Sequence, residues 1–281
     1  MIWGKTLNNT IPEDIVNKYL KNFTRYRFLL KELVKKGIKL KYRRSYLGII
    51  WTLLEPLLTT IVLTIVFSSL LGYNSRPGQP YAVYILTGRL LYGFFNESTK
   101  VAMRSIRANS AMIKKVYVPK YLYPLASVIY TFVIFLLSLM VLAGTEVVMG
   151  VKPTIHILEC ILPIIVLFLF SFGVSMILAT ISVFFRDLEY LWNVITMLIM
   201  YCSAIFYYTD RLKGLAAKLV RVNPLYCIIS NFRSNVLFGR SILTGGDESQ
   251  MFIYALVVSL ILDVVGIYMF YKKQDEFILQ I

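Results

Sequence analysis

Long apolar runs, separated by short polar links, make up most of this chain. Six runs are candidates for membrane-crossing helices: residues 49–71, 81 to beyond 95, 122–148, 161–185, 188–208 and 251–271. A hydrocarbon core about 30 Å thick needs roughly 18 or more apolar residues in one helix, and only the run from Tyr81 is weak. The runs do not alternate in polarity as the strands of a membrane β-barrel do. The pattern predicts an all-α integral membrane protein whose transmembrane domain, residues 49–271, has six helices.

The polar residues 1–48 contain a helical pattern of another kind. Apolar side chains recur there at steps of three and four, which places them on one helical face: Ile15, Tyr19, Phe23, Tyr26, Leu30, Leu33 and Gly37. Lysines and arginines occupy the other face, as in helices that lie in a membrane interface. A soluble helix packed on a partner is the alternative. We expect residues 13–37 to form an amphipathic interfacial helix within the N-terminal segment.

The polar link before the last run contains a shorter apolar stretch, "VNPLYCIISNFRSNVLFG". It is too short to cross a membrane and is interrupted by Asn223-Pro224 and Arg233. Backbone inside a membrane needs protein or water around it. Residues 210–240 are therefore predicted to form short re-entrant helices that cap the bundle or line a channel on its outer side. A seventh span is the alternative.

The 30 lysines and arginines outnumber the 15 acidic residues and are distributed unevenly. Residues 1–49 hold twelve and residues 100–120 hold six, whereas the links at 72–80 and 149–154 hold one each. Because such residues collect on the cytoplasmic side, we predict a multi-pass protein of the cell membrane with both termini cytoplasmic, including a tail at 272–281. The excess of positive charge favours membrane lipids as partners, and no nucleic-acid motif accompanies it.

Charged residues inside the apolar runs are candidates for function, because each costs roughly 2.5–3.5 kcal/mol at the centre of a span. Glu55 directly precedes Pro56, Asp263 lies in the last run, and the weak second run holds Arg89, Glu97 and Lys100. Glu97 and Lys100 are three residues apart and are expected to pair on one helical face. Several such charges together indicate a hydrated path lined by protein. Structural pairing or snorkelling is the alternative for each.

The fifth run ends in an aromatic cluster at its outer side. Its rings are Tyr201, Phe206, Tyr207 and Tyr208. Flat rings with polar edges suit stacking against sugars, so a sugar-conducting channel is one interpretation. An aromatic belt at the membrane interface is the other.

The basic link between the second and third runs contains "SAMIKKVYVP", with Ser110 as a helix cap and Pro119 as a stop. A short helix there is a candidate contact for a soluble partner, and so is Arg186-Asp187 in the link "FFRDLEYL". The P-loop pattern that holds nucleotide phosphates does not occur in the chain, so a separate subunit must bind any ATP. One histidine and three dispersed cysteines suggest no metal site.

Four segments in this order carry a family resemblance: "YRRSYLGIIWTLLEPLL", "ANSAMIKKVYVPKYLYPLASVIY", "SVFFRDLEYLWNVI" and "NPLYCIISNFRSNVLFG". The chain resembles, over nearly its whole length, the transmembrane permease subunit of type 2 ABC exporters for polysaccharides such as O-antigen, teichoic acid and capsule. The resemblance implies a homodimer with two copies of an ATP-binding cassette subunit, which binds ATP and magnesium. It also implies transport of a glycan on undecaprenyl pyrophosphate, with no catalysis in this chain.

The same resemblance implies roles for individual residues. The coupling helix maps to Ser110, Ala111, Met112, Ile113, Lys114, Lys115, Val116 and Tyr117, with Arg186 and Asp187 as a second contact to the ATPase. Arg43 and Arg44 lie where lipid pyrophosphate approaches, and Glu55 and Arg89 are further substrate candidates, although the family has an apolar or small residue at the position of Arg89. The outer gate maps to residues 210–240 with Asn223, Pro224 and the aromatic cluster. An exporter of drugs or lipids, or a membrane-embedded glycosyltransferase, is the alternative.

Overall fold

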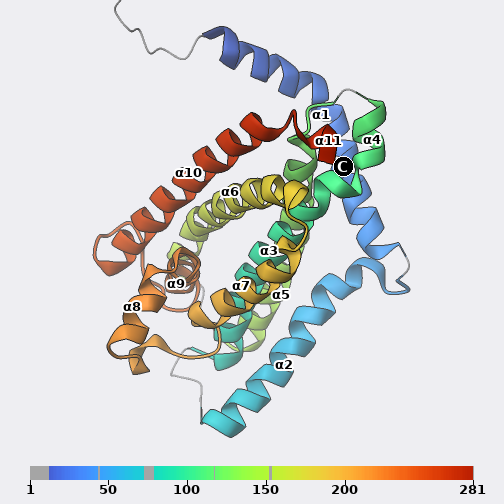
Figure 1. Cartoon of the computed structure of the whole chain (residues 1–281). Helices are drawn as coiled ribbons and strands as arrows, with labels where there is room; N and C mark the ends of the chain where they lie inside the picture. Colours follow the sequence, from blue (N-terminus) through green and yellow to red (C-terminus); the bar gives the residue numbers. More distant parts are fainter. Residues whose placement is uncertain (1–12, 44, 73–78, 117, 152–153, 281) are drawn as a thin grey trace, which may run out of the picture.

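A computed structural model describes residues 13–43, 45–72, 79–116, 118–151 and 154–280, with only the backbone for residues 13–25, 70, 71 and 211. Within these ranges every regular element is a helix (Figure 1). The α-helices are α1 (Glu13–Tyr42), α2 (Trp51–Leu71), α3 (Tyr81–Ala108), α4 (Ser110–Lys115), α5 (Leu122–Val148), α6 (Ile161–Phe184), α7 (Leu188–Cys202), α8 (Leu215–Val222), α9 (Pro224–Val236), α10 (Asp247–Lys273) and α11 (Phe277–Gln280). The 3₁₀ helices are η1 (Gly48–Ile50), η2 (Ile155–Cys160) and η3 (Thr209–Arg211).

Four segments of the described chain are long and apolar enough to cross a membrane: Gly48–Ser69, Leu122–Val148, Ile155–Phe184 and Asp247–Lys273. α7 is apolar but has only 15 residues. The predicted all-α membrane architecture is confirmed, but length and hydropathy identify four spans and a shorter apolar helix rather than six spans. The difference concerns α3, which carries several charged side chains, and α7, which ends at Cys202 rather than near Tyr208.

α3 lies in the centre of the bundle and packs against α5 and α6 (Figure 1). Its 28 residues make a helix about 42 Å long at 1.5 Å per residue, which is enough to cross a membrane. Most of its side chains are buried against protein rather than exposed on the outer surface. Three of its charged residues, Glu97, Arg104 and Arg107, form ion pairs with other helices, which helps a helix of modest hydropathy to occupy the centre.

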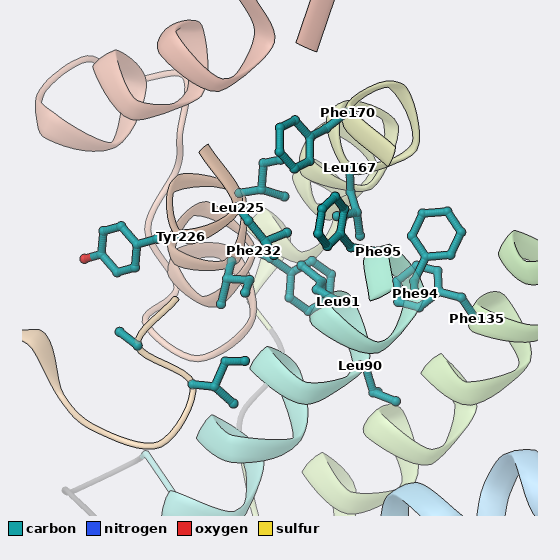
Figure 2. Packing of buried hydrophobic residues seen from close by; sticks show 14 of the residues in the cluster. Leu90, Leu91, Phe94, Phe95, Phe135, Leu167, Phe170, Leu225, Tyr226 and Phe232 are labelled. Atoms are coloured by element: carbon teal, nitrogen blue, oxygen red, sulfur yellow. The ribbon is translucent and has the colours of Figure 1, made fainter. Parts of the chain in front are cut away.

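Aromatic side chains fill the core around α3. Phe95 stacks on Phe170 of α6 with ring centroids 5.2 Å apart, and Phe94 meets Phe135 of α5 at the same distance. Figure 2 shows these rings converging from the three helices, with Leu225 and Phe232 of α9 close by. Dispersion contacts and burial of such large rings supply much of the packing energy in a core of this kind.

α6 and α10 approach each other closely because two glycines face the contact. A Cβ atom on Gly173 would lie 2.7 Å from backbone atoms of Leu262 and Asp263, and one on Gly266 would lie 2.7 Å from the Gly173 carbonyl oxygen. Small residues at helix crossings let backbones approach in this way in membrane proteins. The carboxyl group of Asp263, predicted as an intramembrane charge, is thereby buried against the α6 backbone.

One end of the bundle collects α4, α11 and the middle of α1 around Leu33 (Figure 1). The predicted amphipathic helix is confirmed as α1, which continues five residues further, to Tyr42. It crosses α5, where Gly37 lies so close to the Tyr130 ring that a Cβ atom would overlap it. The predicted tail is not extended, because α10 runs to Lys273 and α11 follows it with Phe277 fully buried.

The opposite end carries the two short helices α8 and α9 (Figure 1). The prediction of a short helix pair before the last span is confirmed, with Asn223-Pro224 at the break between them. α9 is buried along most of its length among α3, α6 and α10, whereas α8 is largely exposed. The pair thus closes this end of the bundle.

Candidate functional site

α4 is almost a direct extension of α3. The Asn109 side chain donates from Nδ2 to the Ser105 carbonyl oxygen at 2.8 Å, and the Asn109 carbonyl accepts from the backbone N–H groups of Met112 and Ile113, both at 3.0 Å. Asn109 is the N-cap residue and Ser110 is the first residue of the helix, so the prediction that Ser110 caps it is wrong. These hydrogen bonds make the position of α4 depend on the end of α3.

α4 is anchored on one side and exposed on the other. Ile113 is 7% exposed and packs with Ile106 and Phe277 in a small apolar cluster. The exposed residues of the predicted coupling stretch are Ala111, Lys114, Lys115 and Val116, while Ser110 and Met112 are half-buried. Tyr117 lies outside the described residues. The protein therefore presents a short basic tip on an apolar base.

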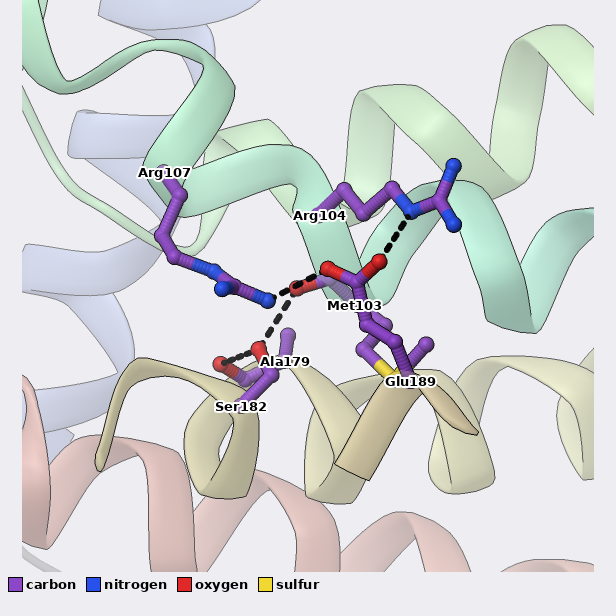
Figure 3. A network of polar contacts seen from close by, with 6 residues as sticks. All are labelled: Met103, Arg104, Arg107, Ala179, Ser182 and Glu189. Carbon is purple, nitrogen blue, oxygen red and sulfur yellow. Dashed lines mark hydrogen bonds and ion pairs between the residues drawn. The ribbon is translucent and has the colours of Figure 1, made fainter. Parts of the chain in front are cut away.

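The turn before α7 holds the second predicted partner contact. Arg186 and Asp187 are both exposed there. Glu189 in the first turn of α7 forms ion pairs with two residues of α3: Oε2 lies 2.9 Å from Nε of Arg104, and Oε1 lies 2.6 Å from Nη2 of Arg107 (Figure 3). This cluster joins the start of α7 to the part of α3 that leads into α4.

A cavity of about 320 Å³ with several charged and polar groups in its lining lies among α1, the start of α2, the middle of α3 and α5. The structure brings Glu55 and Arg89 together in its lining, with Trp51, Tyr92 and Asn96. Glu55 is exposed and Arg89 is half-buried, and the Asn96 Oδ1 atom is buried with no hydrogen-bond partner in the described chain. Rings, charges and an amide around one hollow are groups that bind a polar ligand.

The two arginines before α2 are not part of this cavity. Arg43 is exposed in the turn after α1 and borders a separate hollow that also includes Lys35, Lys36 and Lys39. Arg44 lies outside the described residues. Arg43 is thus part of a basic surface of α1, which is the kind of surface that anionic headgroups attract.

α1 is tied to the bundle beside the cavity. Lys41 Nζ lies 3.0 Å from Glu97 Oε1, so the predicted pairing of Glu97 with Lys100 is wrong, because α1 brings a lysine to the same carboxylate. Burial raises the pKa of the Tyr42 phenol, and the nearby carboxylates of Glu55 and Glu97 raise it further. The phenol therefore stays a hydrogen-bond donor at neutral pH.

The helical part of α7 ends before the predicted aromatic cluster, and residues 203–208 continue without regular structure. Ala204 has φ +47°, which few residues other than glycine adopt. Phe206 is buried and stacks on Phe67 of α2 with centroids 5.2 Å apart, and Tyr208 is also buried. Tyr201 is exposed, and Tyr207 is half-buried and donates to the Tyr201 carbonyl at 2.6 Å. The Tyr201 and Phe206 rings contact each other with centroids 6.5 Å apart, and the four rings differ in exposure.

Asn223 and Pro224 begin α9. Asn223 Oδ1 accepts from the Leu225 N–H at 3.0 Å, and Pro224 takes the first helical position, where its missing N–H is not needed. The Asn223 Nδ2 group donates to Ser203 Oγ at 2.9 Å and to the Cys202 carbonyl at 3.2 Å. This single side chain caps α9 and also holds it to the end of α7.

Residues 29–237 match the family model described as ABC-2 type transporter, which covers most of the chain. The chain belongs to the ABC-2 type transporter family. An O-antigen export system permease protein RfbA of Klebsiella pneumoniae is 30% identical over 89% of this chain and 93% of that protein. The RfbA protein of Myxococcus xanthus is 25% identical over 77% and 83%. The capsule polysaccharide export inner-membrane protein CtrC of Neisseria meningitidis is 21% identical over 86% and 91%.

Membership makes the chain an ABC-2 membrane permease, a transport subunit without a nucleotide-binding domain. The family assignment suggested by the four sequence segments is therefore confirmed. ATP in this family is bound by a partner ATPase, which agrees with the lack of a P-loop pattern in the sequence.

Sequence reasoning missed two polar residues of this ABC-2 permease. Glu189 was not distinguished from its exposed neighbours, because its partners Arg104 and Arg107 lie 85 and 82 residues away in the sequence. Arg233 was treated only as an interruption of an apolar stretch. It is fully buried and donates to Tyr84, Ala204 and Ile205 carbonyls and to Thr87 Oγ1. No pattern near Arg233 in the sequence points to those partners.

Proposed function

We propose that this ABC-2 permease exports a polysaccharide, carried on undecaprenyl pyrophosphate, from the cytoplasm to the outer face of the plasma membrane. The observation that carries the proposal is the match at 30% identity to an O-antigen export permease over nearly the full length of both chains. The match to a capsule export protein supports the same substrate class. No other class of substrate is represented among these relatives.

The proposed topology has six spans, formed by α2, α3, α5, α6, α7 and α10, with both termini cytoplasmic. The central position of α3 supports a span for it despite its charges, because most of its side chains are buried against protein and Glu97, Arg104 and Arg107 form ion pairs with other helices. The concentration of lysine and arginine in residues 1–49 and 100–120 supports the orientation. In this orientation α4 and α11 lie on the cytoplasmic side, and α8 and α9 lie on the outer side.

α4 is the proposed coupling helix for an ATP-binding cassette subunit, two copies of which bind ATP and magnesium. The exposed Lys114 and Lys115 on an apolar base support a docking role. Arg186 and Asp187 in the neighbouring turn extend the proposed contact. The permease itself is proposed to be a homodimer, which is the assembly that the resemblance to polysaccharide exporters implies.

The cavity lined by Glu55 and Arg89 is proposed to meet the polar part of the substrate, and Arg43 and Arg44 the lipid pyrophosphate. Arg89 supports this because it has no ion pair within the described chain and is half-buried beside the cavity. α8 and α9, with Asn223-Pro224 and the cluster of Tyr201, Phe206, Tyr207 and Tyr208, form the proposed outer gate. Their place at the end opposite α4 supports this role.

The substrate class is tested in a strain that lacks the chain. We expect loss of surface glycan and accumulation of undecaprenyl-linked glycan inside the cell, both reversed by the intact chain. Normal surface glycan together with a new sensitivity to a small molecule would instead indicate an exporter of drugs or lipids. Sugar transfer by the purified chain without a partner would indicate a glycosyltransferase.

The coupling role is tested by changing Lys114 and Lys115 together to Glu. We expect affinity for the ATPase subunit to fall about tenfold or more, because the rim charges of the contact are reversed. Pull-down of the ATPase and its stimulated hydrolysis are the measurements. Lys213→Glu with Lys218→Glu is the matched control, since it makes the same change in charge at the opposite end of the molecule. Unchanged assembly and hydrolysis in the first variant contradict the coupling role.

A further inference from the structure

α7 is held to the rest of the subunit along a narrow inner edge. Its buried residues are Leu188, Trp192 and Thr196. The large apolar residues on its other sides are exposed: Tyr190, Leu191, Val194, Met197, Leu198 and Tyr201. Ile195, Ile199 and Met200 are partly buried against the core, so the apolar contacts of α7 lie along one side only and do not strictly set its register along α3.

Directional polar contacts fix it instead, at three successive levels. Glu189 binds Arg104 and Arg107 in the first turn of α7. One turn later Trp192 Nε1 donates to Thr99 Oγ1 at 3.1 Å, and then the Thr196 carbonyl accepts from the Tyr92 hydroxyl at 2.9 Å. The partner residues on α3 occur in the reverse order along the sequence, so α3 and α7 run antiparallel with a row of polar contacts between them. Such bonds set the register between helices more strictly than apolar contacts do.

The Glu189 contact is the strongest of the three. Both carboxylate oxygens are used, each by a different guanidinium group, and the Glu189 and Arg107 side chains are only 24% exposed. Charge-assisted bonds in partly buried surroundings are stronger than neutral bonds or exposed ion pairs. Close by, Ser182 Oγ of α6 donates to the Met103 carbonyl at 2.6 Å, which holds α6 to the same turn of α3 (Figure 3).

The Glu189 contact lies close to Asn109, the single residue between α3 and α4. Arg107 is two residues before Asn109, whose hydrogen bonds link the end of α3 to the first turn of α4. A displacement of α4 therefore moves the arginines with it. Through Glu189 the same displacement reaches α7, whose own apolar contacts to the subunit lie along one side only.

We propose that Glu189 is a positioning residue that makes α7 follow α4 during the ATP-driven cycle. The proposal rests on the proposed function in one respect, namely that α4 docks on the ATP-binding subunit. It assigns the Arg104–Glu189–Arg107 cluster as the route by which motion at α4 reaches the helix that ends at the outer gate.

The test uses the complete permease–ATPase complex in proteoliposomes. Glu189→Gln removes the charge of the carboxylate and keeps its shape. Glu276→Gln is the control, because Glu276 carries a similar charge at the same end of the bundle but pairs with Lys273, three residues before it, at 2.8 Å. A third version reverses all three charges, with Glu189→Arg, Arg104→Glu and Arg107→Glu.

Two readouts separate positioning from a merely structural role. The first is the ratio of glycan export to ATP hydrolysis, which Glu189→Gln is expected to lower about tenfold or more while hydrolysis changes less than about twofold. The second is maleimide labelling of Cys202, the exposed thiol at the far end of α7, since Cys160 and Cys227 are buried. ATP binding should change the Cys202 labelling rate in the wild type and in Glu276→Gln, but not in Glu189→Gln.

The proposal is overturned if Glu189→Gln keeps both the wild-type export ratio and the ATP-dependent change at Cys202. If Glu189→Gln does not assemble, the charge-reversed version decides: recovery of both readouts supports the proposal, and no recovery overturns it. Failure of the proposed function looks different. A wrong substrate class abolishes glycan export in the wild type but leaves the Cys202 response, and a wrong coupling helix appears as normal assembly of the Lys114→Glu, Lys115→Glu variant.

Discussion

Replacement of Arg233 is expected to loosen the end of the bundle that carries α8 and α9. Its guanidinium group donates to the Ala204 carbonyl at 2.9 Å, to the Tyr84 carbonyl at 2.8 Å and to the Ile205 carbonyl at 3.3 Å. The carbon at its centre lies 3.6 Å from the centroid of the Tyr84 ring. Gly88 leaves room for it, since a Cβ atom there would lie 2.5 Å from Nη2. One side chain thus binds α9 to α3 and to the irregular segment after α7.

The size of the expected loss of stability depends on which carbonyl groups Arg233→Met leaves without a hydrogen-bond donor. The Ala204 carbonyl keeps the Tyr84 hydroxyl at 3.2 Å, and the Tyr84 carbonyl keeps Thr87 Oγ1 at 2.9 Å. The Ile205 carbonyl loses its donor, which costs about 1–3 kcal/mol in a buried site. Lost charge-assisted bonds add about 1.5–3 kcal/mol each, but removing a buried cation returns several kcal/mol. The net loss of stability is expected to be about 2–4 kcal/mol.

Arg233→Lys distinguishes geometry from charge. An ammonium group has its three donors on one atom, so it cannot reach carbonyls on α3 and on residues 204–205 together, and it still bears the cost of a buried charge. We therefore expect Lys to be no better than Met.

The assay is thermal unfolding of the solubilised protein, with hydrogen exchange of residues 203–208 as the local measurement. At about 2–4 °C per kcal/mol, both variants should lower Tm by roughly 4–16 °C and increase exchange in that segment. A Lys variant with the wild-type Tm refutes the geometric argument. A Met variant with wild-type exchange shows that Arg233 does not hold the segment at all.

Two further predictions concern packing. Gly173→Val places side-chain atoms against the α10 backbone, because even a Cβ atom would lie 2.7 Å from atoms of Leu262 and Asp263. We expect this overpacking to lower the stability by about 3 kcal/mol or more. A Tm within about 2 °C of the wild type would contradict the close crossing of α6 and α10. Phe277→Ala empties a fully buried site that contacts Ile113; we expect about 3 kcal/mol of lost stability and weaker ATPase stimulation, and normal stimulation would show that α11 does not support α4.

Much of the fold was predictable because its signals are local. The apolar runs that became α2, α5, α6 and α10 each contain enough residues to cross a membrane without reference to any other segment. The periodicity of residues 13–37 identified α1, and the interruption at Asn223-Pro224 indicated a pair of short helices, which α8 and α9 are. These elements differ from expectation mainly at their ends.

The polar contacts were not predictable because their partners are distant in the sequence. Arg233 meets Thr87 across 146 residues, and Glu189 meets Arg104 across 85. A lone arginine in an apolar stretch does not indicate whether it faces lipid, water or carbonyl groups. Lys41 likewise displaced the nearer Lys100 from Glu97, because the path of α1 across the bundle depends on tertiary packing.

The low hydropathy of α3 and its central position are connected, because several of its polar residues contact other helices. Its polar residues are the groups that bind other elements: Arg104 and Arg107 hold α7, Glu97 holds α1, and Thr87 meets Arg233 of α9. A uniformly apolar helix would insert more readily into lipid, but it would have no directional contacts through which motion at one end reaches the other. Three of the charges that lower the membrane-span signal of α3, Glu97, Arg104 and Arg107, are thus the ones that connect it to α1 and α7.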